Sequence, residues 1–212
     1  NVNSIKELIK SLGFTNSSIK PSIEELLLNP EKIYITKKDS VQSAIRIGKK
    51  MFNRKHPDYF KFSILNTVLG GYFGSRLMSN IREDKGYTYG IGSGLATNLN
   101  DGYFFISTEV GSDVCQDAIK EIYFETERLR NEKIPTEELQ LVKNYLFGAF
   151  QRSIDGPFSL ADRQKSLFLN SLNNSHLEQY LTELANITPE ILLICAQKHL
   201  EQSSFTEVVA GP

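Results

Sequence analysis

The sequence has no tryptophan and only two cysteines and three histidines among its 212 residues. Cys115 and Cys195 stand far apart in apolar helical patterns, which favours buried free thiols over a disulfide or a metal site. None of His56, His176 and His199 lies in an H-x-x-E-H motif or in another cluster with three ligands at helical spacing. The sequence therefore predicts no catalytic zinc within this chain.

The sequence also has no excess of charge of one sign, since its 24 Lys and Arg residues nearly balance its 25 Asp and Glu residues and the formal net charge is −1. This balance provides no basic field for nucleic acid or anionic lipid. No apolar run approaches the roughly 18 residues of a membrane helix, and no signal-peptide pattern opens the chain. We therefore expect a soluble protein of a bacterial cytoplasm or periplasm, with neither nucleic acid nor a membrane as partner.

The length suits one large domain preceded by a short lead-in. Residues 1–31 are predicted to be a helical lead-in from a preceding domain, with short helices over 5–12 and 22–28. A helix packed on the same domain is the alternative reading of this segment. The chain opens on Asn1 rather than Met, which favours a fragment of a longer protein.

Residues 32–212 are predicted to form the domain itself, in which strands come early, helices come late and one strand returns. Alternating apolar residues predict strands over 33–36, 41–48, 87–94, 103–110 and 205–210, and the turn Asn100-Asp101-Gly102 predicts a hairpin between the third and the fourth. Helical spacing predicts helices over 57–69, 75–84, 114–132, 135–150, 157–172 and 189–200. This order is typical of an α+β domain with a mostly antiparallel sheet and helices on one face.

The stretch 70–94 organises the rest of the chain. Its predicted helix ends at Gly86, where a residue free to adopt positive φ is expected. In the strand that follows, every second residue from Gly90 to Gly94 is glycine, so another segment must approach this backbone closely. Close packing inside the domain is the favoured reading, and strand addition by an extended peptide is the alternative.

The same stretch resembles the zinc-free second domain of pitrilysin-type zinc peptidases, the inverzincins that include insulin-degrading enzyme and the mitochondrial processing peptidases. The resemblance covers roughly residues 32–211. It is carried by the runs Ser75-Arg76-Leu77, Ile81-Arg82-Glu83 and Lys85-Gly86-Tyr87-Thr88-Tyr89.

In that family, an arginine and a tyrosine seven residues apart reach into the zinc site of the homologous first domain. Arg82 and Tyr89 match the pair in type and spacing. The resemblance therefore implies that Arg82 and Tyr89 are catalytic and substrate-binding residues, that Arg82 positions the peptide, and that Tyr89 donates to the oxyanion. It also implies zinc in a partner domain and an isolated chain that is inactive.

The implied function is the C-terminal half of a zinc metalloendopeptidase that cleaves unfolded peptides. The zinc-bearing half lies either earlier in the same chain or on a separate subunit, so a homo- or heterodimer stays open. A non-catalytic scaffold subunit and a plain peptide-binding module are the alternatives. Taken alone, Arg82 and Tyr89 also fit a surface arginine in a last helical turn and a tyrosine of a half-buried strand.

Overall fold

The computed structural model describes residues 1–13 and 29–212. Its strands are β1 (Lys32–Thr36), β2 (Gln42–Met51), β3 (Ile91–Thr97), β4 (Gly102–Gly111) and β5 (Thr206–Gly211). Its helical segments are α1 (Val2–Ser11), α2 (Tyr59–Asn66), η1 (Thr67–Gly71), η2 (Met78–Asp84), η3 (Ser112–Val114), α3 (Cys115–Asn131), α4 (Thr136–Arg152), α5 (Gly156–Leu169), α6 (Ser175–Asn186), α7 (Pro189–His199) and η4 (Gln202–Ser204). The predicted helix over 22–28 lies outside the described residues.

The five strands form one sheet in the order β1-β5-β2-β4-β3. Only the β1–β5 pair is parallel, so the mostly antiparallel sheet is confirmed. Side chains alternate along each inner strand: Ile45 and Ile47 of β2 are buried with Ile106 of β4, whereas Arg46 and Glu109 point to the other face and are exposed. One face of the sheet therefore carries the core and the other is open.

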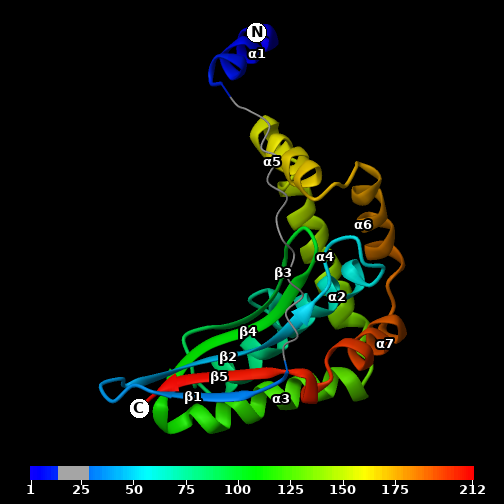
Figure 1. Cartoon of the computed structure of the whole chain (residues 1–212). Helices are drawn as coiled ribbons and strands as arrows, with labels where there is room; N and C mark the ends of the chain where they lie inside the picture. Colours follow the sequence, from blue (N-terminus) through cyan, green and yellow to red (C-terminus); the bar gives the residue numbers. More distant parts are fainter. Residues whose placement is uncertain (14–28) are drawn as a thin grey trace.

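Helices cover the core-bearing face, as the α+β prediction requires. In Figure 1, α3 runs along the sheet and α4, α5 and α6 extend from one end of it. The predicted helices that fall on described residues recur with small shifts at their ends, and Thr188 caps α7 by accepting a hydrogen bond from the Ile191 amide at 3.3 Å. Helix α6 was not predicted, although Leu177, Leu181 and Leu184 have helical spacing.

Two segments in the organising stretch are π-helical, η1 and η2. Helix η1 packs directly on β3: a Cβ atom added to Gly70 would lie 2.6 Å from the Ser93 amide nitrogen. The Asn66 side-chain amide also donates to the Ser93 carbonyl at 3.3 Å. The predicted close approach of another segment to this glycine-rich strand is confirmed, and its partner is a helix of the same domain.

The prediction of a strand from Tyr87 is wrong for residues 87–90, since β3 begins at Ile91. The Thr88 hydroxyl accepts a hydrogen bond from the Gly90 amide at 3.1 Å and so closes a local turn in place of the strand ladder. Gly86 has a φ of +67°, which confirms the predicted break after the preceding helix. Tyr89 therefore lies on a turn rather than on a half-buried strand.

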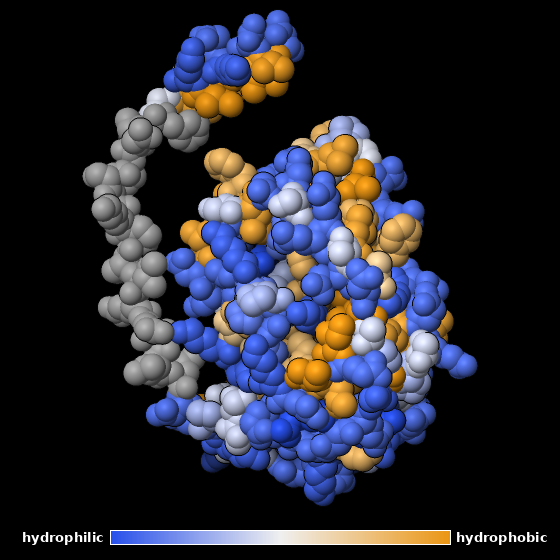
Figure 2. Space-filling model, turned by 90° about the vertical axis from the view of Figure 1, so that its right-hand side faces the viewer, coloured by the Kyte–Doolittle hydropathy of each residue, from blue (hydrophilic) through white to orange (hydrophobic). Residues whose placement is uncertain are grey.

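Helix α1 is amphipathic and has no buried residue. Its apolar side chains are 51–67% exposed, and Figure 2 shows apolar side chains gathered along one side of this helix. They are Val2, Ile5, Leu8, Ile9 and Leu12. Among the described residues, no helix has both the length and the apolar composition needed to cross a bilayer.

Candidate functional site

The structure brings the two predicted site residues together at the end of η2. Arg82 Nε donates a hydrogen bond to the Tyr89 main-chain carbonyl at 3.0 Å. The Arg82 guanidinium also lies 4.8 Å from the centre of the Phe73 ring, a cation–π distance. These contacts fix the Arg82 side chain, which is nevertheless 35% exposed. Its Nη1 lies 3.9 Å from Glu83 Oε1, whereas its Nη2 has no hydrogen-bond partner among the described residues and can meet a ligand.

The Tyr89 side chain is 96% exposed and extends from the turn that Arg82 holds. Its backbone is fixed while its phenol projects into solvent. An exposed tyrosine on a fixed turn can donate a hydrogen bond to an acceptor on another molecule without losing an internal contact. The pair thus combines a positioned guanidinium with an accessible phenol.

Two threonine hydroxyls fix the Tyr89 turn from the side of the sheet. Thr88 Oγ1 donates to the Glu109 carbonyl at 2.7 Å and accepts from the Gly90 amide at 3.1 Å. Thr108 Oγ1, on β4, lies 3.0 Å from both Thr88 Oγ1 and the Gly90 carbonyl oxygen. The turn is therefore tied to β4 as well as to η2.

A shallow hollow of about 300 Å³ lies beside the Tyr89 turn on the open face of the sheet. Arg46 and Glu109 lie on its floor, with 3.7 Å between Arg46 Nη2 and Glu109 Oε1. Its other lining residues are Gln42, Thr88, Tyr89, Gly90, Ser107 and Thr108. Polar groups next to Tyr89 thus face the same open surface.

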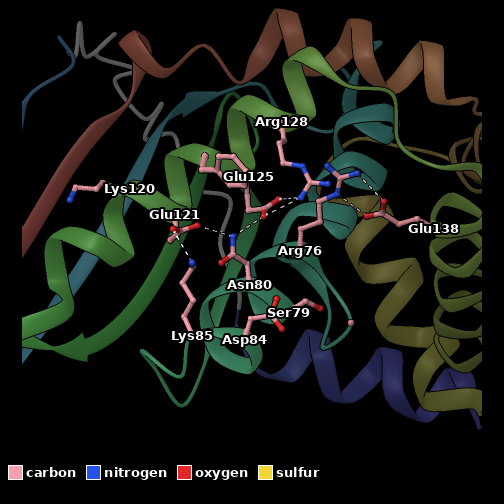
Figure 3. Close-up of a pocket in the computed structure, with 12 residues that line it drawn as sticks. Arg76, Ser79, Asn80, Asp84, Lys85, Lys120, Glu121, Glu125, Arg128 and Glu138 are labelled. Carbon is pink, nitrogen blue, oxygen red and sulfur yellow. Dashed lines mark hydrogen bonds and ion pairs between the residues drawn. The ribbon is translucent and has the colours of Figure 1, made fainter.

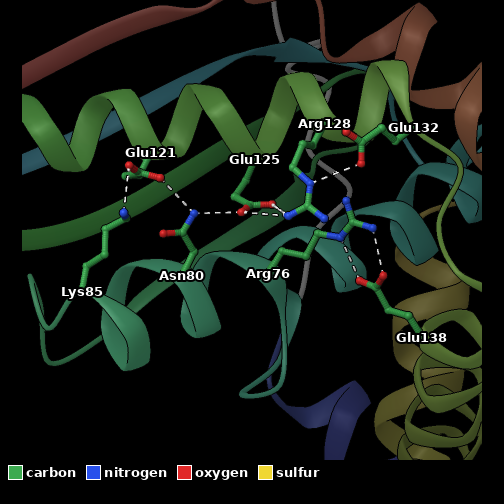
Figure 4. A network of polar contacts seen from close by, with 8 residues as sticks. All are labelled: Arg76, Asn80, Lys85, Glu121, Glu125, Arg128, Glu132 and Glu138. Atoms are coloured by element: carbon green, nitrogen blue, oxygen red, sulfur yellow. Dashed lines mark hydrogen bonds and ion pairs between the residues drawn. The ribbon is translucent and has the colours of Figure 1, made fainter.

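A buried polar network holds η2 from its other side (Figure 4). Asn80 of η2 donates through its side-chain amide to Glu125 at 2.8 Å and to Glu121 at 3.0 Å, both on α3. The Glu125 side chain is only 3% exposed. Lys85, just after η2, lies 3.2 Å from Glu121. Helix η2 is thereby fastened to α3 by partly buried hydrogen bonds, of which Glu125 is the most enclosed partner.

Arg76 extends this network to α4. Its Nε and Nη2 donate to Glu138 at 2.8 and 2.9 Å, a two-pronged pair. Burial alone would lower the pKa of Arg76, but the hydrogen bonds with Glu138 and the negative charges of Glu138, Glu125 and Glu132 together outweigh that effect and raise the pKa. The guanidinium therefore stays charged although its side chain is only 8% exposed.

Beside the network lies a groove of about 850 Å³, drawn in Figure 3. Its charged lining is mixed and paired: Arg76 binds Glu138, Arg128 lies 3.4 Å from Glu125, and Lys85 binds Glu121. Because these charges neutralise one another, the groove presents little field of one sign to a ligand. The paired charges mainly serve to hold helix η2, whose last turn carries Arg82.

The three histidines do not gather into a metal site. His56 stacks on Phe52 at 4.0 Å, and His199 lies 2.9 Å from Asp58 through Nε2. His176 is on α6, 4.6 Å from the Phe60 ring. Within residues 1–13 and 29–212, no group of three His, Cys, Asp or Glu side chains is arranged to hold a metal ion. The residues that the structure describes therefore do not fit a zinc centre.

Sequence reasoning missed the residues that position the pair. Thr88 lies inside the motif that carries the family resemblance, but its hydroxyl has no periodic signal. Arg76 and Glu138 meet across 62 positions, and Asn80 and Glu125 across 45. Such contacts depend on how α3 and α4 cross η2, which no local pattern encodes.

Comparison with known proteins gives consistent results. A family model described as "Peptidase M16 inactive domain" matches residues 2–146. The chain is 26% identical over 187 residues to the Bacillus subtilis (strain 168) protein named "Uncharacterized zinc protease YmxG", which covers 88% of this chain and 46% of that protein. The chain thus spans about half the length of the curated relatives that it matches.

Solved structures share the fold. A peptidase M16 inactive domain from Pseudomonas fluorescens is 26% identical, with a TM-score of 0.86 and coverage of 99% of this chain and 51% of that one. A protease from Helicobacter pylori is 18% identical, with a TM-score of 0.87 and coverage of 100% and 53%. The likeness extends over the whole chain and over about half of each neighbour.

Proposed function

This chain belongs to the family of peptidase M16 inactive domains, and from that premise we propose that it is the zinc-free half of a zinc-dependent metalloendopeptidase. Its membership agrees with the resemblance carried by the stretch around Arg82 and Tyr89. The homologous half, on the same chain or on a partner subunit, would supply the zinc ion that activates water. Residues 1–31 would connect the two halves.

The geometry of the pair supports the roles that the resemblance implies for this half. The Arg82 guanidinium, held by the Tyr89 carbonyl and the Phe73 ring, would donate to the backbone of an extended peptide near the scissile bond. The Tyr89 phenol would donate to the peptide carbonyl oxygen as it becomes an oxyanion. Both roles need a fixed backbone and an accessible side chain.

The observation that carries the proposal is the hydrogen bond from Arg82 Nε to the Tyr89 carbonyl, combined with the 96% exposure of the Tyr89 side chain. An isolated exposed tyrosine is common at a surface. A tyrosine whose turn is fixed by a charged neighbour while its phenol faces outward is suited to acting on a second body. An unfolded peptide is the proposed substrate.

The experiment is a Tyr89→Phe substitution in the complete protein that contains both halves. Removing one oxyanion donor typically costs about 10²–10³ in rate, so peptide turnover should fall at least about tenfold while zinc content stays unchanged. Tyr103→Phe, at another exposed tyrosine, is the matched control and should leave turnover intact. Unaltered turnover in Tyr89→Phe would refute the assignment.

Turnover and peptide binding of variants at Arg82 and Tyr89 distinguish this proposal from its alternatives. A scaffold subunit would show no peptide turnover that depends on Arg82 or Tyr89. A plain peptide-binding module would bind peptide equally well after both side chains are removed.

A further inference from the structure

A further pocket, about 560 Å³ in volume, lies among α2, α5 and α6 and has two guanidiniums in its lining. Arg54, in the loop after β2, and Arg163, on α5, both line it. Its walls add serine hydroxyls, two tyrosines and His176, which can donate or accept hydrogen bonds. The only carboxylate in the lining is that of Asp162, so the charged lining is net positive, unlike the balanced lining of the groove beside Arg76.

The two guanidiniums are bound to neutral partners. Arg54 donates to Thr97 Oγ1 at 2.9 Å and to Ser166 Oγ at 2.8 Å. Arg163 donates to the Ser153 hydroxyl and stacks 4.7 Å from the centre of the Phe150 ring. Among the described residues, neither arginine forms an ion pair with a carboxylate. Their positive charge is therefore left uncompensated.

The two arginines lie close together. Arg54 binds Ser166, and Ser166 stands three residues after Arg163 on α5, so the two residues share one helix face. The field of both reaches a third group, since burial, followed by the charges of Arg54 and Arg163, lowers the pKa of His176. The one acidic lining residue, Asp162, lies on the exposed rim and pairs with Lys165 at 2.7 Å.

Apolar and aromatic side chains form the remaining walls of the pocket. Leu167 is buried, and the Phe60 and Tyr180 rings lie 5.5 Å apart between α2 and α6. An oxyanion with an apolar body attached would therefore satisfy both the donors and the walls. The volume suits one or two amino-acid residues.

We propose that this pocket binds the free C-terminal carboxylate of a peptide whose last side chain is apolar. The planar fork of a guanidinium matches a carboxylate, and the apolar walls would hold the terminal side chain. The choice of a peptide terminus rests on the proposed peptidase function, whereas the preference for an oxyanion rests on the pocket alone. The site is separate from Arg82 and Tyr89, neither of which lines it.

The test measures binding of a dye-labelled peptide that ends in leucine to the full chain by fluorescence anisotropy. The peptide is prepared once with a free carboxylate and once as the carboxamide. The acid should bind at least about tenfold more tightly, as expected for charge-assisted hydrogen bonds. Arg54→Gln and Arg163→Gln should each remove most of that preference, and the thermal melting of each variant establishes that it is folded.

Lys55→Gln is the matched control, because it removes the same charge from the neighbouring, exposed residue outside the pocket and should keep the preference. Equal binding of acid and amide would overturn the proposal, as would a loss of preference in Lys55→Gln as large as that in Arg54→Gln. Displacement of the acid by inorganic phosphate at similar concentrations would also overturn it, in favour of a general phosphate site. Tyr89→Phe should keep the acid preference, so this result is independent of the turnover result.

Discussion

The two sides of helix η2 differ in how strongly the rest of the protein holds them. On one side, Asn80 is hydrogen-bonded to two glutamates of α3, and the neighbouring Arg76 is bound at two points to Glu138. On the other side, Arg82 makes one hydrogen bond to a main-chain carbonyl and Tyr89 projects into solvent. A single short helix thus has one side held by many hydrogen bonds, although Arg76 Nη1 has no partner among the described residues, and an exposed side held by few.

The difference indicates that the two sides of η2 have separate functions. A side chain can act on a second molecule only if its own hydrogen-bonding groups are free, and it can act precisely only if its backbone is fixed. The buried network fixes the backbone, and the exposed pair keeps its groups free. Changes on the buried side should therefore alter stability, and changes on the exposed side should alter activity.

The largest expected effect on stability comes from Arg76→Met. Removing one partner of a buried ion pair leaves the other poorly compensated and typically costs 3–5 kcal/mol. Since Glu138 is 29% exposed and partly regains water, we expect the lower end, about 3 kcal/mol in the free energy of unfolding. Urea unfolding of the chain measures this loss.

Lys120→Met is the control for that loss, because Lys120 pairs with Asp117 at the surface, where solvent screens the ion pair, and should lose far less stability than Arg76→Met. If the two variants lost equal stability, the buried network would be no more important than any surface pair.

Acid should lower the contribution of a second charged side chain, Asp58, to the free energy of unfolding. This prediction extends the comparison beyond η2. Desolvation alone would raise the pKa of Asp58, but hydrogen bonds from Lys198 and His199 lower it to about 2 from 3.8. A depressed carboxyl pKa stabilises the folded state above the unfolded value and loses this stabilisation as the pH falls from 3.8 to about 2. The stability difference between the native protein and Asp58→Asn should therefore shrink across that interval, as measured by urea unfolding at a series of pH values. A constant difference would contradict it.

A smaller effect on stability is expected from Thr88→Val, because Thr88 lies next to Tyr89 and its hydroxyl is hydrogen-bonded to the sheet. The substitution keeps the shape of the side chain but removes the hydroxyl that ties the Tyr89 turn to Glu109 and Gly90. Loss of these two hydrogen bonds should cost roughly 1–2 kcal/mol in the free energy of unfolding. If Thr88 positions Tyr89, kcat in the complete protein should fall more than KM changes, and Thr88→Ser should restore it. A purely structural hydroxyl would lower stability without this effect on kcat.

The sequence predicted much of the fold because its patterns are local. The hairpin of β3 and β4 followed from Asn100-Asp101-Gly102, and the helix ending before Gly86 followed from apolar spacing and a glycine at the break. The π-helical turns of η1 and η2 have no such signal, because they result from packing on β3 and α3. The strand predicted through Tyr89 was wrong for a related reason. Residues 87–90 alternate as a strand would, but the hydrogen bond from the Gly90 amide to the Thr88 hydroxyl closes a turn instead.

That turn leads to the smallest expected effect on stability, in Tyr89→Phe. The side chain is 96% exposed, so removing its hydroxyl breaks no internal contact and should change the free energy of unfolding by less than about 0.5 kcal/mol. The same variant should lower turnover of the complete protein at least about tenfold. A variant that unfolds at the same urea concentration but turns over peptide far more slowly would separate the exposed pair from the buried network. A variant that lost stability and activity together would instead make Tyr89 part of the scaffold, and the contrast between the two sides of η2 would no longer hold.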